Sequence, residues 1–213
     1  MLNVLLLKWV GLNMALALTP VVLAHLIYAL LGPVYSRTGT ASKALGLALG
    51  AAWLFFLPNT CYLLTEWRHY LDQLGYTSLH WRWHTDSGAL VDLMMQTLFY
   101  MCYSGFGLLA FALAVRPIAR LFRDSGADLW AWGFPLFILN SLGVYLGLVL
   151  RYNSWEMLTG PSQIWASVAS ISSRPVLLSF IIAFAGFLWL AYVIMDIWVD
   201  GFLARWKQIR GNG

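Results

Sequence analysis

Residues 175–199 read PVLLSFIIAFAGFLWLAYVIMDIWV, an almost uninterrupted run of apolar side chains. A helix needs about 20 such residues to cross the hydrocarbon core of a bilayer. Four similar runs precede it, near residues 9–31, 43–64, 90–115 and 129–150. Each run is continuously apolar, whereas the strands of a membrane barrel alternate, so we predict helices. The expected fold is all-α, a polytopic transmembrane helix bundle with about five spans.

The composition is that of a membrane protein. Of the 213 residues, 61% are hydrophobic and only 10% are charged, whereas soluble domains carry roughly 25% charged residues. Lipid covers the apolar surface that so few charges would leave in water. The net charge of +4 is scattered and includes no basic run, which argues against nucleic-acid binding. We predict a single integral membrane domain, 1–213, in contact with membrane lipids.

Lysine and arginine residues near the predicted spans indicate the orientation, because they are enriched on the cytoplasmic side. One side of the bundle holds five of the 13, and the other holds eight. The eight are Arg37, Lys43, Arg116, Arg120, Arg123, Arg205, Lys207 and Arg210. We therefore predict a protein of the cytoplasmic (inner) membrane, with its N-terminus outside and its C-terminus in the cytoplasm.

Two longer connections, 66–89 and 151–174, fall on the outer side. The first is rich in tryptophan and tyrosine, so we expect it to lie on the membrane surface. In the second, apolar residues recur at helical spacing after Pro161. This pattern predicts a short helix in the plane of the interface.

Small and polar residues within the spans indicate how the helices pack. Gly46 and Gly50, and likewise Gly143 and Gly147, form G-x-x-x-G pairs that let helices approach closely. We interpret both pairs as packing positions. Asn140 lies in the middle of span four, where we expect a structural hydrogen bond to Asn59 or to a backbone carbonyl.

Polar side chains gather where three spans end on the outer side. They follow span two, begin span three and follow span four, so the topology brings them to one face of the membrane. The residues are Asn59, Glu66, His69, Asp92, Arg151, Asn153 and Ser154. They predict a shared polar site at the extracytoplasmic face.

Glu66 and His69 are three residues apart, so they share a face if the helix continues. They form a candidate pair of metal ligands, or a base with its orienting group. We predict that Asp92 joins them across the gap between helices. These three are the candidate catalytic residues and the candidate ligands of a divalent metal. The candidate ligand-binding residues, with amide, hydroxyl or guanidinium groups, are Asn59, Arg151, Asn153 and Ser154.

Each of these residues could instead have an ordinary structural role. Glu66 and His69 would face water at the interface, and Asp92 would cap the third span. Arg151 would contact lipid phosphates or pair with a carboxylate of the cluster. His80 and His84 lie four apart in the outer connection, where they are weak candidates for metal binding.

These stretches resemble a known family of bacterial and archaeal membrane proteins, domain of unknown function 1361. The residues that carry the resemblance are Leu57–Pro58–Asn59, Tyr62, Thr65–Glu66, His69, Asp92, Tyr145, Gly147, Arg151 and Asn153–Ser154–Trp155. Glu66 and Glu156 stand where the family has aspartate, and Leu148 stands where a second arginine is usual. The resemblance implies a multi-span membrane fold and no established activity.

Two kinds of function fit the sequence. The first is a site that binds a metal ion or an anionic, lipid-like ligand, with or without hydrolase or transferase chemistry. The second is a non-catalytic structural or accessory subunit of a membrane protein complex. No nucleophile motif, nucleotide signature or H-E-x-x-H motif is present to name a reaction, so the sequence leaves enzymatic activity open. A transporter is less favoured, because its ionisable residues would lie nearer mid-membrane.

Overall fold

The computed structural model describes residues 4–32, 40–76, 79–126, 129–148, 161–171 and 173–211. Helices occupy nearly all of these residues, which confirms the predicted all-α class. They are α1 (Val4–Leu31), α2 (Thr40–Phe56), α3 (Pro58–Thr65), α4 (Trp67–Tyr76), α5 (Leu79–Arg82), α6 (Ser87–Asp124), α7 (Leu129–Leu148), α9 (Pro161–Ile171) and α10 (Pro175–Gly211).

Within the described residues, four segments are long and apolar enough to cross a membrane. They are Lys8–Leu31, Thr40–Asp72, Ser87–Asp124 and Pro175–Gly211. The fifth predicted span corresponds to α7, whose described apolar part, Gly133–Leu148, is shorter than the other four. The polytopic helical architecture is therefore confirmed, with four long helices and one shorter apolar helix in place of five similar spans.

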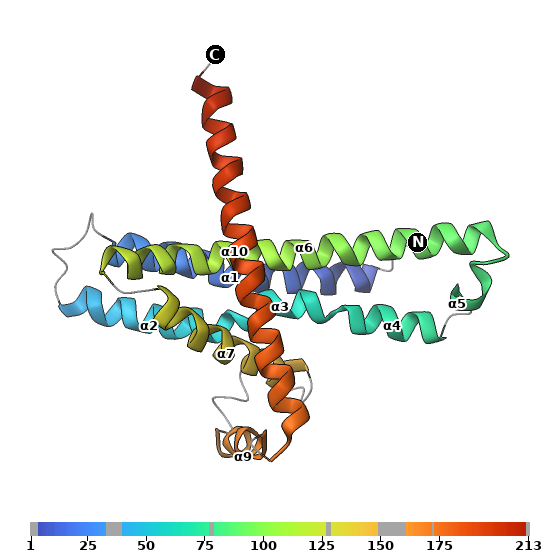
Figure 1. Ribbon diagram of the computed structural model, residues 1–213, viewed down its shortest axis with the longest axis horizontal. Coiled ribbons are helices and arrows are strands. Elements are labelled where there is room, and N and C mark those ends of the chain that lie inside the picture. Colours follow the sequence, from blue (N-terminus) through green and yellow to red (C-terminus); the bar gives the residue numbers. More distant parts are fainter. Residues whose placement is uncertain are drawn as a thin grey trace.

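Figure 1 shows α1 and α6 running in the same direction, with α2, α3 and α4 following one another in the opposite direction beside them. Cross-helix contacts agree: Tyr28 meets Asp124 on α6, whereas Trp53 of α2 meets Ala114 and Tyr70 of α4 meets Thr97. Helix α10 crosses α6 and α7 steeply, and its C-terminal part projects from the bundle.

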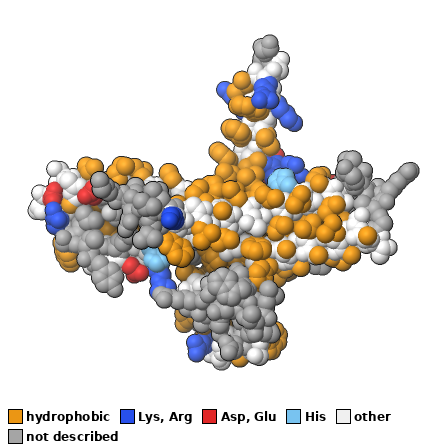
Figure 2. All heavy atoms as spheres, turned by 180° about the vertical axis from the view of Figure 1, so that it is seen from behind, with side chains coloured by type: hydrophobic (Ala, Val, Ile, Leu, Met, Phe, Trp, Pro, Cys, Tyr) orange, Lys and Arg blue, Asp and Glu red, His pale blue; other side chains and the backbone are white. Residues whose placement is uncertain are grey.

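Hydrophobic side chains cover much of the face seen in Figure 2. Among the described residues, exposed apolar side chains include Leu18 and Val22 of α1 and Phe134 and Leu139 of α7. Water would disfavour so large an apolar surface, whereas lipid accommodates it. The surface therefore agrees with the composition in pointing to an integral membrane protein.

Helices α2, α3 and α4 follow one another with a break of one residue between each pair. Pro58 begins α3 and has no backbone N–H to donate, so the first interruption falls at Leu57. The second falls at Glu66, where the backbone N–H of His69 still donates to the carbonyl oxygen of Glu66 at 2.9 Å. Residues 67–76, which we expected to be part of a surface connection, instead continue as α4 along α6.

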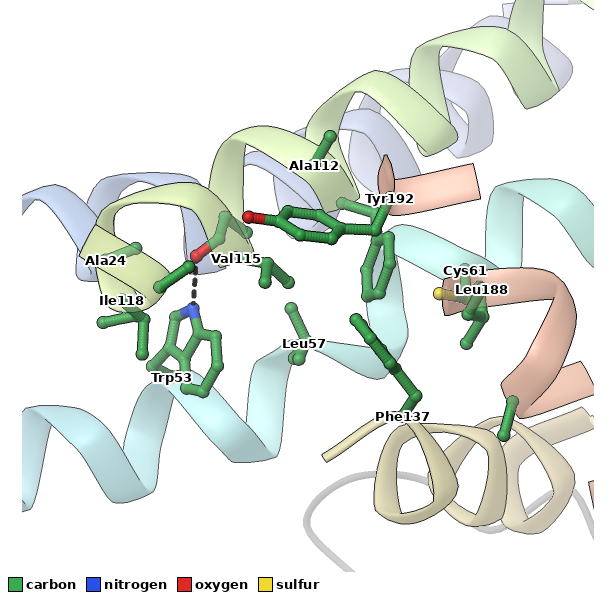
Figure 3. Packing of buried hydrophobic residues seen from close by; sticks show 14 of the residues in the cluster. Ala24, Trp53, Leu57, Cys61, Ala112, Val115, Ile118, Phe137, Leu188 and Tyr192 are labelled. Atoms are coloured by element: carbon green, nitrogen blue, oxygen red, sulfur yellow. Dashed lines mark hydrogen bonds between the residues drawn. The ribbon is translucent and has the colours of Figure 1, made fainter. Parts of the chain in front are cut away.

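The largest buried cluster lies where α1, α2, α3, α6, α7 and α10 meet. Leu57, Phe137 and Leu188 are fully buried there (Figure 3). The indole Nε1 of Trp53 donates to the carbonyl oxygen of Ala114 at 3.0 Å, which links α2 to α6. A buried donor with a partner avoids the cost of an unsatisfied polar group, so this bond fixes the two helices in register.

Glycine allows the closest helix approach between α3 and α7. A Cβ on Gly143 would lie 2.6 Å from Cγ of Pro58, and one on Gly147 would overlap the Tyr62 side chain. The Tyr62 hydroxyl donates to the carbonyl oxygen of Gly143 at 3.3 Å. The second G-x-x-x-G pair therefore packs α7 on α3, as predicted. In the first pair, Gly46 packs against Leu31 of α1, but a Cβ on Gly50 would meet nothing within 4 Å, so the predicted packing role is wrong for Gly50.

Asn140 is buried beside this contact. Its Nδ2 donates to Sγ of Cys61 at 3.2 Å. The expected structural role is therefore present, although the partner is a thiol instead of Asn59 or a backbone carbonyl. Helix α9, which begins at Pro161 as predicted, contacts the start of α10.

Candidate functional site

The candidate site is centred on Glu66, at the interruption between α3 and α4. Its Oε2 lies 3.8 Å from Nε2 of His69, one helical turn further along. The two side chains are 28% and 66% exposed. The predicted pairing of Glu66 and His69 is thus present in the structure, half-buried on the carboxylate side and open on the imidazole side.

Hydrogen bonds to α6 hold this part of the chain in place. The indole Nε1 of Trp67 donates to Oγ of Ser104 at 2.8 Å. The Ser104 hydroxyl in turn donates to the carbonyl oxygen of Leu63 at 3.4 Å. One turn further along α4, the hydroxyl groups of Tyr70 and Thr97 are 2.6 Å apart. Residues on both sides of Glu66 are therefore tied to the same neighbouring helix, which preorganises the site.

Two tyrosines of α6, Tyr100 and Tyr103, lie within electrostatic range of the Glu66 carboxylate. The Tyr103 hydroxyl also forms a hydrogen bond with Asn13 of α1, and the ring of Tyr100 lies 5.2 Å from the ring of Tyr70. The pair of Glu66 and His69 therefore lies near two phenols of α6.

The α6 residues of this site were missing from the sequence prediction. Thr97, Tyr100, Ser104 and Gly107 follow the i, i+3, i+7, i+10 spacing of one helix face. This polar and aromatic face within an apolar span could have indicated that α6 contributes to the site. Gly107 marks the closest approach, because a Cβ there would lie 2.7 Å from the carbonyl oxygen of Thr60.

The structure does not bring Asp92 to Glu66. The pairing of Tyr70 with Thr97 places Asp92 opposite Gly75, because α4 and α6 run antiparallel. Glu66 is nine residues away from that level, about 13 Å at 1.5 Å per residue. Asp92 is exposed, and within the described part of the chain no hydrogen bond or ion pair involves it.

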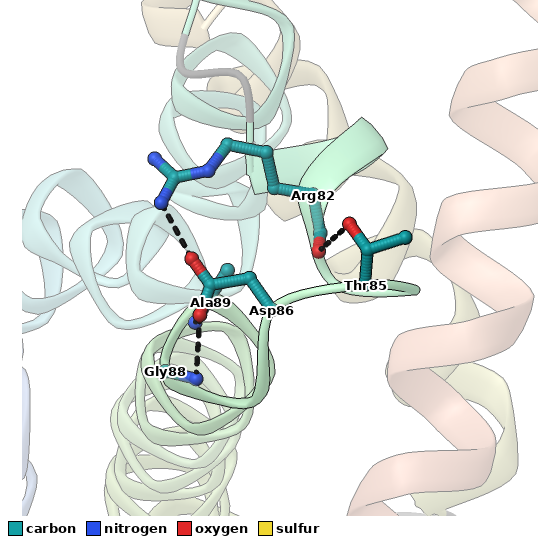
Figure 4. Close-up of polar contacts among 5 residues, drawn as sticks. All are labelled: Arg82, Thr85, Asp86, Gly88 and Ala89. Carbon is teal, nitrogen blue, oxygen red and sulfur yellow. Dashed lines mark hydrogen bonds and ion pairs between the residues drawn. The ribbon is translucent and has the colours of Figure 1, made fainter.

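The N-terminus of α6 is capped by Asp86 instead of Asp92, because α6 begins at Ser87, before the predicted start of the span. Asp86 Oδ1 accepts from the backbone N–H groups of Gly88 and Ala89, at 2.9 and 3.3 Å (Figure 4). Arg82 Nη2 lies 2.5 Å from Asp86 Oδ2. The hydrogen bond from Arg82, followed by the two backbone donors, lowers the pKa of Asp86.

The proposed ligand-binding residues fall into two groups. Asn59 is buried in α3, two helical turns before Glu66. Arg151, Asn153 and Ser154 lie outside the described residues. Of the predicted site, the structure therefore places the Glu66–His69 pair together, and it places Asn59 deeper in the bundle.

Among the described side chains, no group of three or more His, Cys, Asp or Glu residues is arranged to hold a metal ion. The Glu66–His69 pair supplies two potential ligands. His84 is exposed and lies against Trp83, with ring centroids 3.6 Å apart. A metal at Glu66 and His69 would therefore need further ligands from water, from a bound molecule or from residues beyond the described ranges.

A second polar cluster joins α6 to α10. Arg116, interpreted above only as an orientation signal, is buried. Its Nε lies 3.2 Å from Oδ1 of Asp196, and its Nη2 contacts Oδ1 of Asp200. Asp196 and Asp200 are four residues apart, so both reach one guanidinium from the same face of α10. The pairing was not predicted, because Asp196 lies within a long apolar run.

Comparison with known proteins gives one finding about the family. Residues 12–191 match a family model described as a protein of unknown function, DUF1361. No curated protein and no solved structure matches the chain. The match covers the candidate site and all the apolar helices, except for residues 4–11 of α1 and 192–211 of α10.

Proposed function

Because the chain belongs to the DUF1361 family, whose description names no reaction, we propose a function from the site itself. We propose that this integral membrane protein binds a divalent metal ion at Glu66 and His69, on the extracytoplasmic side. The ion would leave coordination positions open to an anionic, lipid-like ligand. The separation of the Glu66 and His69 ligand atoms carries the proposal.

That separation suits a shared ion. Imidazole nitrogen and carboxylate oxygen bind zinc at about 2.0–2.2 Å, which puts two ligands of a tetrahedral ion roughly 3.4 Å apart. Oε2 of Glu66 and Nε2 of His69 are 3.8 Å apart. A shift of a few tenths of an ångström closes the difference, and the exposed imidazole has the freedom to make it.

The level of the site supports a position at the outer boundary of the hydrocarbon. Glu66 lies beside Tyr100 and Tyr103 of α6. Because Asn13 bonds Tyr103 and α1 runs parallel to α6, Lys8 lies at about the same level. The Glu66–His69 pair and Lys8 of α1 therefore lie in one layer of the bundle.

A second charged layer lies about 30 Å away. The Trp53–Ala114 hydrogen bond places Lys43, ten residues earlier in the antiparallel α2, at the end of α6 near Arg123 and Arg120. Some 20 residues of α6 separate this layer from Tyr103, roughly 30 Å at 1.5 Å per residue. That spacing matches the hydrocarbon thickness of a bilayer, and the layer richer in lysine and arginine would be cytoplasmic.

The anion-binding half of the proposal comes from the sequence. Arg151 would supply a planar fork of donors, and Asn153 and Ser154 would add neutral donors. A metal at Glu66 and His69 would bind the negative group of the same ligand. We infer a lipid-like ligand because the site lies at the membrane boundary.

The test is metal analysis of the purified protein. We expect about one equivalent of zinc, manganese or iron in the wild-type protein, lost in Glu66→Ala and in His69→Ala with the helical circular dichroism unchanged. Asp92→Ala is the matched carboxylate control, and it should retain the metal because Asp92 lies elsewhere. Equal metal content in Glu66→Ala and wild type, or a metal-free wild type after supplementation, would contradict the proposal.

The alternative is a non-catalytic accessory subunit of a membrane protein complex. The observation that favours it is the hydrogen-bonded network from Trp67 through Ser104 to Leu63, which would fix helix ends whether or not a ligand binds. A metal-free protein that co-purifies with fixed partners in constant proportion would support this function. Loss of those partners in Trp67→Phe would connect them to the network.

A further inference from the structure

The C-terminal part of α10 carries an apolar stripe that stays exposed within the described part of the chain, with its first residue, Trp198, next to Gly105 and Leu109 of α6. Trp198, Phe202, Trp206 and Ile209 are between 46% and 62% exposed. Their i, i+4, i+8, i+11 spacing places them within an arc of about 80° on the helix. Trp198 stacks on Phe202, and Phe202 on Trp206, with ring centroids 6.0 and 6.2 Å apart. The stripe is therefore one continuous aromatic surface.

The same segment is basic. Residues 201–211 include Arg205, Lys207 and Arg210, and no acidic residue. The acidic side chains just before them, Asp196 and Asp200, are both paired with Arg116 of α6. One guanidinium offsets one of these two carboxylates, so Arg116, Asp196 and Asp200 together keep a net charge of −1, whereas residues 201–211 carry +3.

The ion pairs also locate the segment. Arg116 lies one turn before Arg120 and about 10 Å along α6 before Arg123 of the charged layer, at 1.5 Å per residue. Helix α10 leaves α6 at this level and extends sideways from the bundle (Figure 1), with hydrophobic and basic side chains intermixed on its surface (Figure 2). Three cationic side chains are costly in the hydrocarbon, so a segment that extends sideways on this side of the bundle is more stable at the headgroup level.

We propose that the segment from Trp198 to Gly211 is an in-plane anchor that binds the anionic surface of the bilayer. The aromatic stripe would enter the boundary between headgroups and acyl chains, as in other interfacial helices. The basic side chains would meet acidic headgroups, each contributing roughly fivefold to the partition toward the surface. Arg210, with Cζ 5.0 Å from the centre of the Trp206 ring, would hold its charge next to the embedded ring. This anchor is independent of the Glu66 site.

An environment-sensitive fluorophore tests the proposal in the full chain. In a Cys102→Ser background, which removes the exposed cysteine and keeps the buried Cys61, the fluorophore is attached at Phe202→Cys or Ala204→Cys. Residue 202 lies on the stripe, and residue 204 lies about 160° away from it. Each protein is placed in nanodiscs of phosphatidylcholine alone, or with one third phosphatidylglycerol, with and without a nitroxide-labelled lipid.

We expect the label at 202 to show blue-shifted emission and strong quenching by the nitroxide lipid, and the label at 204 to remain in water. Phosphatidylglycerol should increase the shielding at 202. The triple variant Arg205→Gln/Lys207→Gln/Arg210→Gln should lose that increase, about 100-fold in partition from three charges. The proposal would be overturned if the labels at 202 and 204 gave equal signals. It would also be overturned if phosphatidylglycerol did not change the signal of the label at 202 in the protein that keeps all three basic residues.

Discussion

Gly147 shows what one hydrogen atom contributes at the α3–α7 contact. A Cβ at this position would overlap the phenol of Tyr62. We therefore expect Gly147→Ala to destabilise the protein by about 1–3 kcal/mol through overpacking. The measurement is the midpoint of thermal unfolding in detergent, followed by circular dichroism.

Gly186→Ala is the matched control, because a Cβ there meets nothing within 4 Å. Its helix should be unchanged or slightly more stable, since alanine is the better helix former. The double variant Gly147→Ala/Tyr62→Leu should recover part of the loss by removing the overlapping ring. A Gly147→Ala protein as stable as Gly186→Ala would show that the ring moves away at no cost.

At the residue scale, local spacing predicted only part of the site. Glu66 and His69 are close because three residues span one helical turn, so their proximity follows from local geometry. Tyr100 and Tyr103 reach Glu66 through the register of two helices, which a single sequence does not specify. Asp92 was misplaced for the same reason, since its level depends on where α6 begins and on how far α4 continues.

At the element scale, the cap of α6 makes its N-terminus sensitive to acid. The pKa of Asp86 is lowered in the folded protein by Arg82 and by two backbone donors. A lowered folded-state pKa stabilises the fold above the ordinary carboxyl range, and this contribution is lost as the pH falls through that range toward the folded pKa. We expect stability to fall below about pH 4, with fraying of the α6 N-terminus.

Asp86→Asn separates this effect from other carboxylates. Asparagine also caps helices well, but it has no charge to attract Arg82 and it does not titrate. Thermal unfolding between pH 3 and pH 7 should therefore show a smaller pH dependence in the variant than in wild type. Hydrogen exchange at Gly88 and Ala89 would locate the change. Identical pH profiles would mean that the Arg82–Asp86 contact contributes nothing measurable.

The sequence predicted the long helices better than the interruptions between them. Span two was expected to run from 43 to 64, whereas α2 ends at Phe56 and α3 begins at Pro58, because proline lacks the N–H that a helix interior requires. The expected surface connection after Glu66 became α4, since its aromatic residues pack on α6 as well as favouring an interface. Aromatic content alone does not distinguish these two uses.

At the scale of the whole molecule, the Arg116 cluster fixes how α10 crosses α6. Asp196 is 26% exposed and faces the guanidinium Nε, whereas Asp200 is 63% exposed. Removing the partner of a buried charge costs about 3–5 kcal/mol, while an exposed pair contributes up to about 1 kcal/mol. We therefore expect Asp196→Asn to destabilise the protein much more than Asp200→Asn, as measured by thermal unfolding in detergent.

The double variant Arg116→Met/Asp196→Asn tests the cause. It leaves no charge buried without a partner, so it should be more stable than Asp196→Asn alone. Equal stability of Asp196→Asn and Asp200→Asn would contradict this explanation, because it would mean that other groups stabilise the Arg116 guanidinium. The global arrangement of α10 was not predictable from the sequence, because three arginines near the end of α6 offered several equivalent partners.

The length of α6 has a consequence for how the protein fits different membranes. Its 38 residues extend roughly 57 Å, almost twice the hydrocarbon thickness. A helix this long always reaches both headgroup regions, so hydrophobic mismatch does not limit it. The two charged layers would instead set the depth of the protein in the membrane. In a thicker or thinner bilayer the bundle would change its tilt, and Glu66 would stay in contact with water.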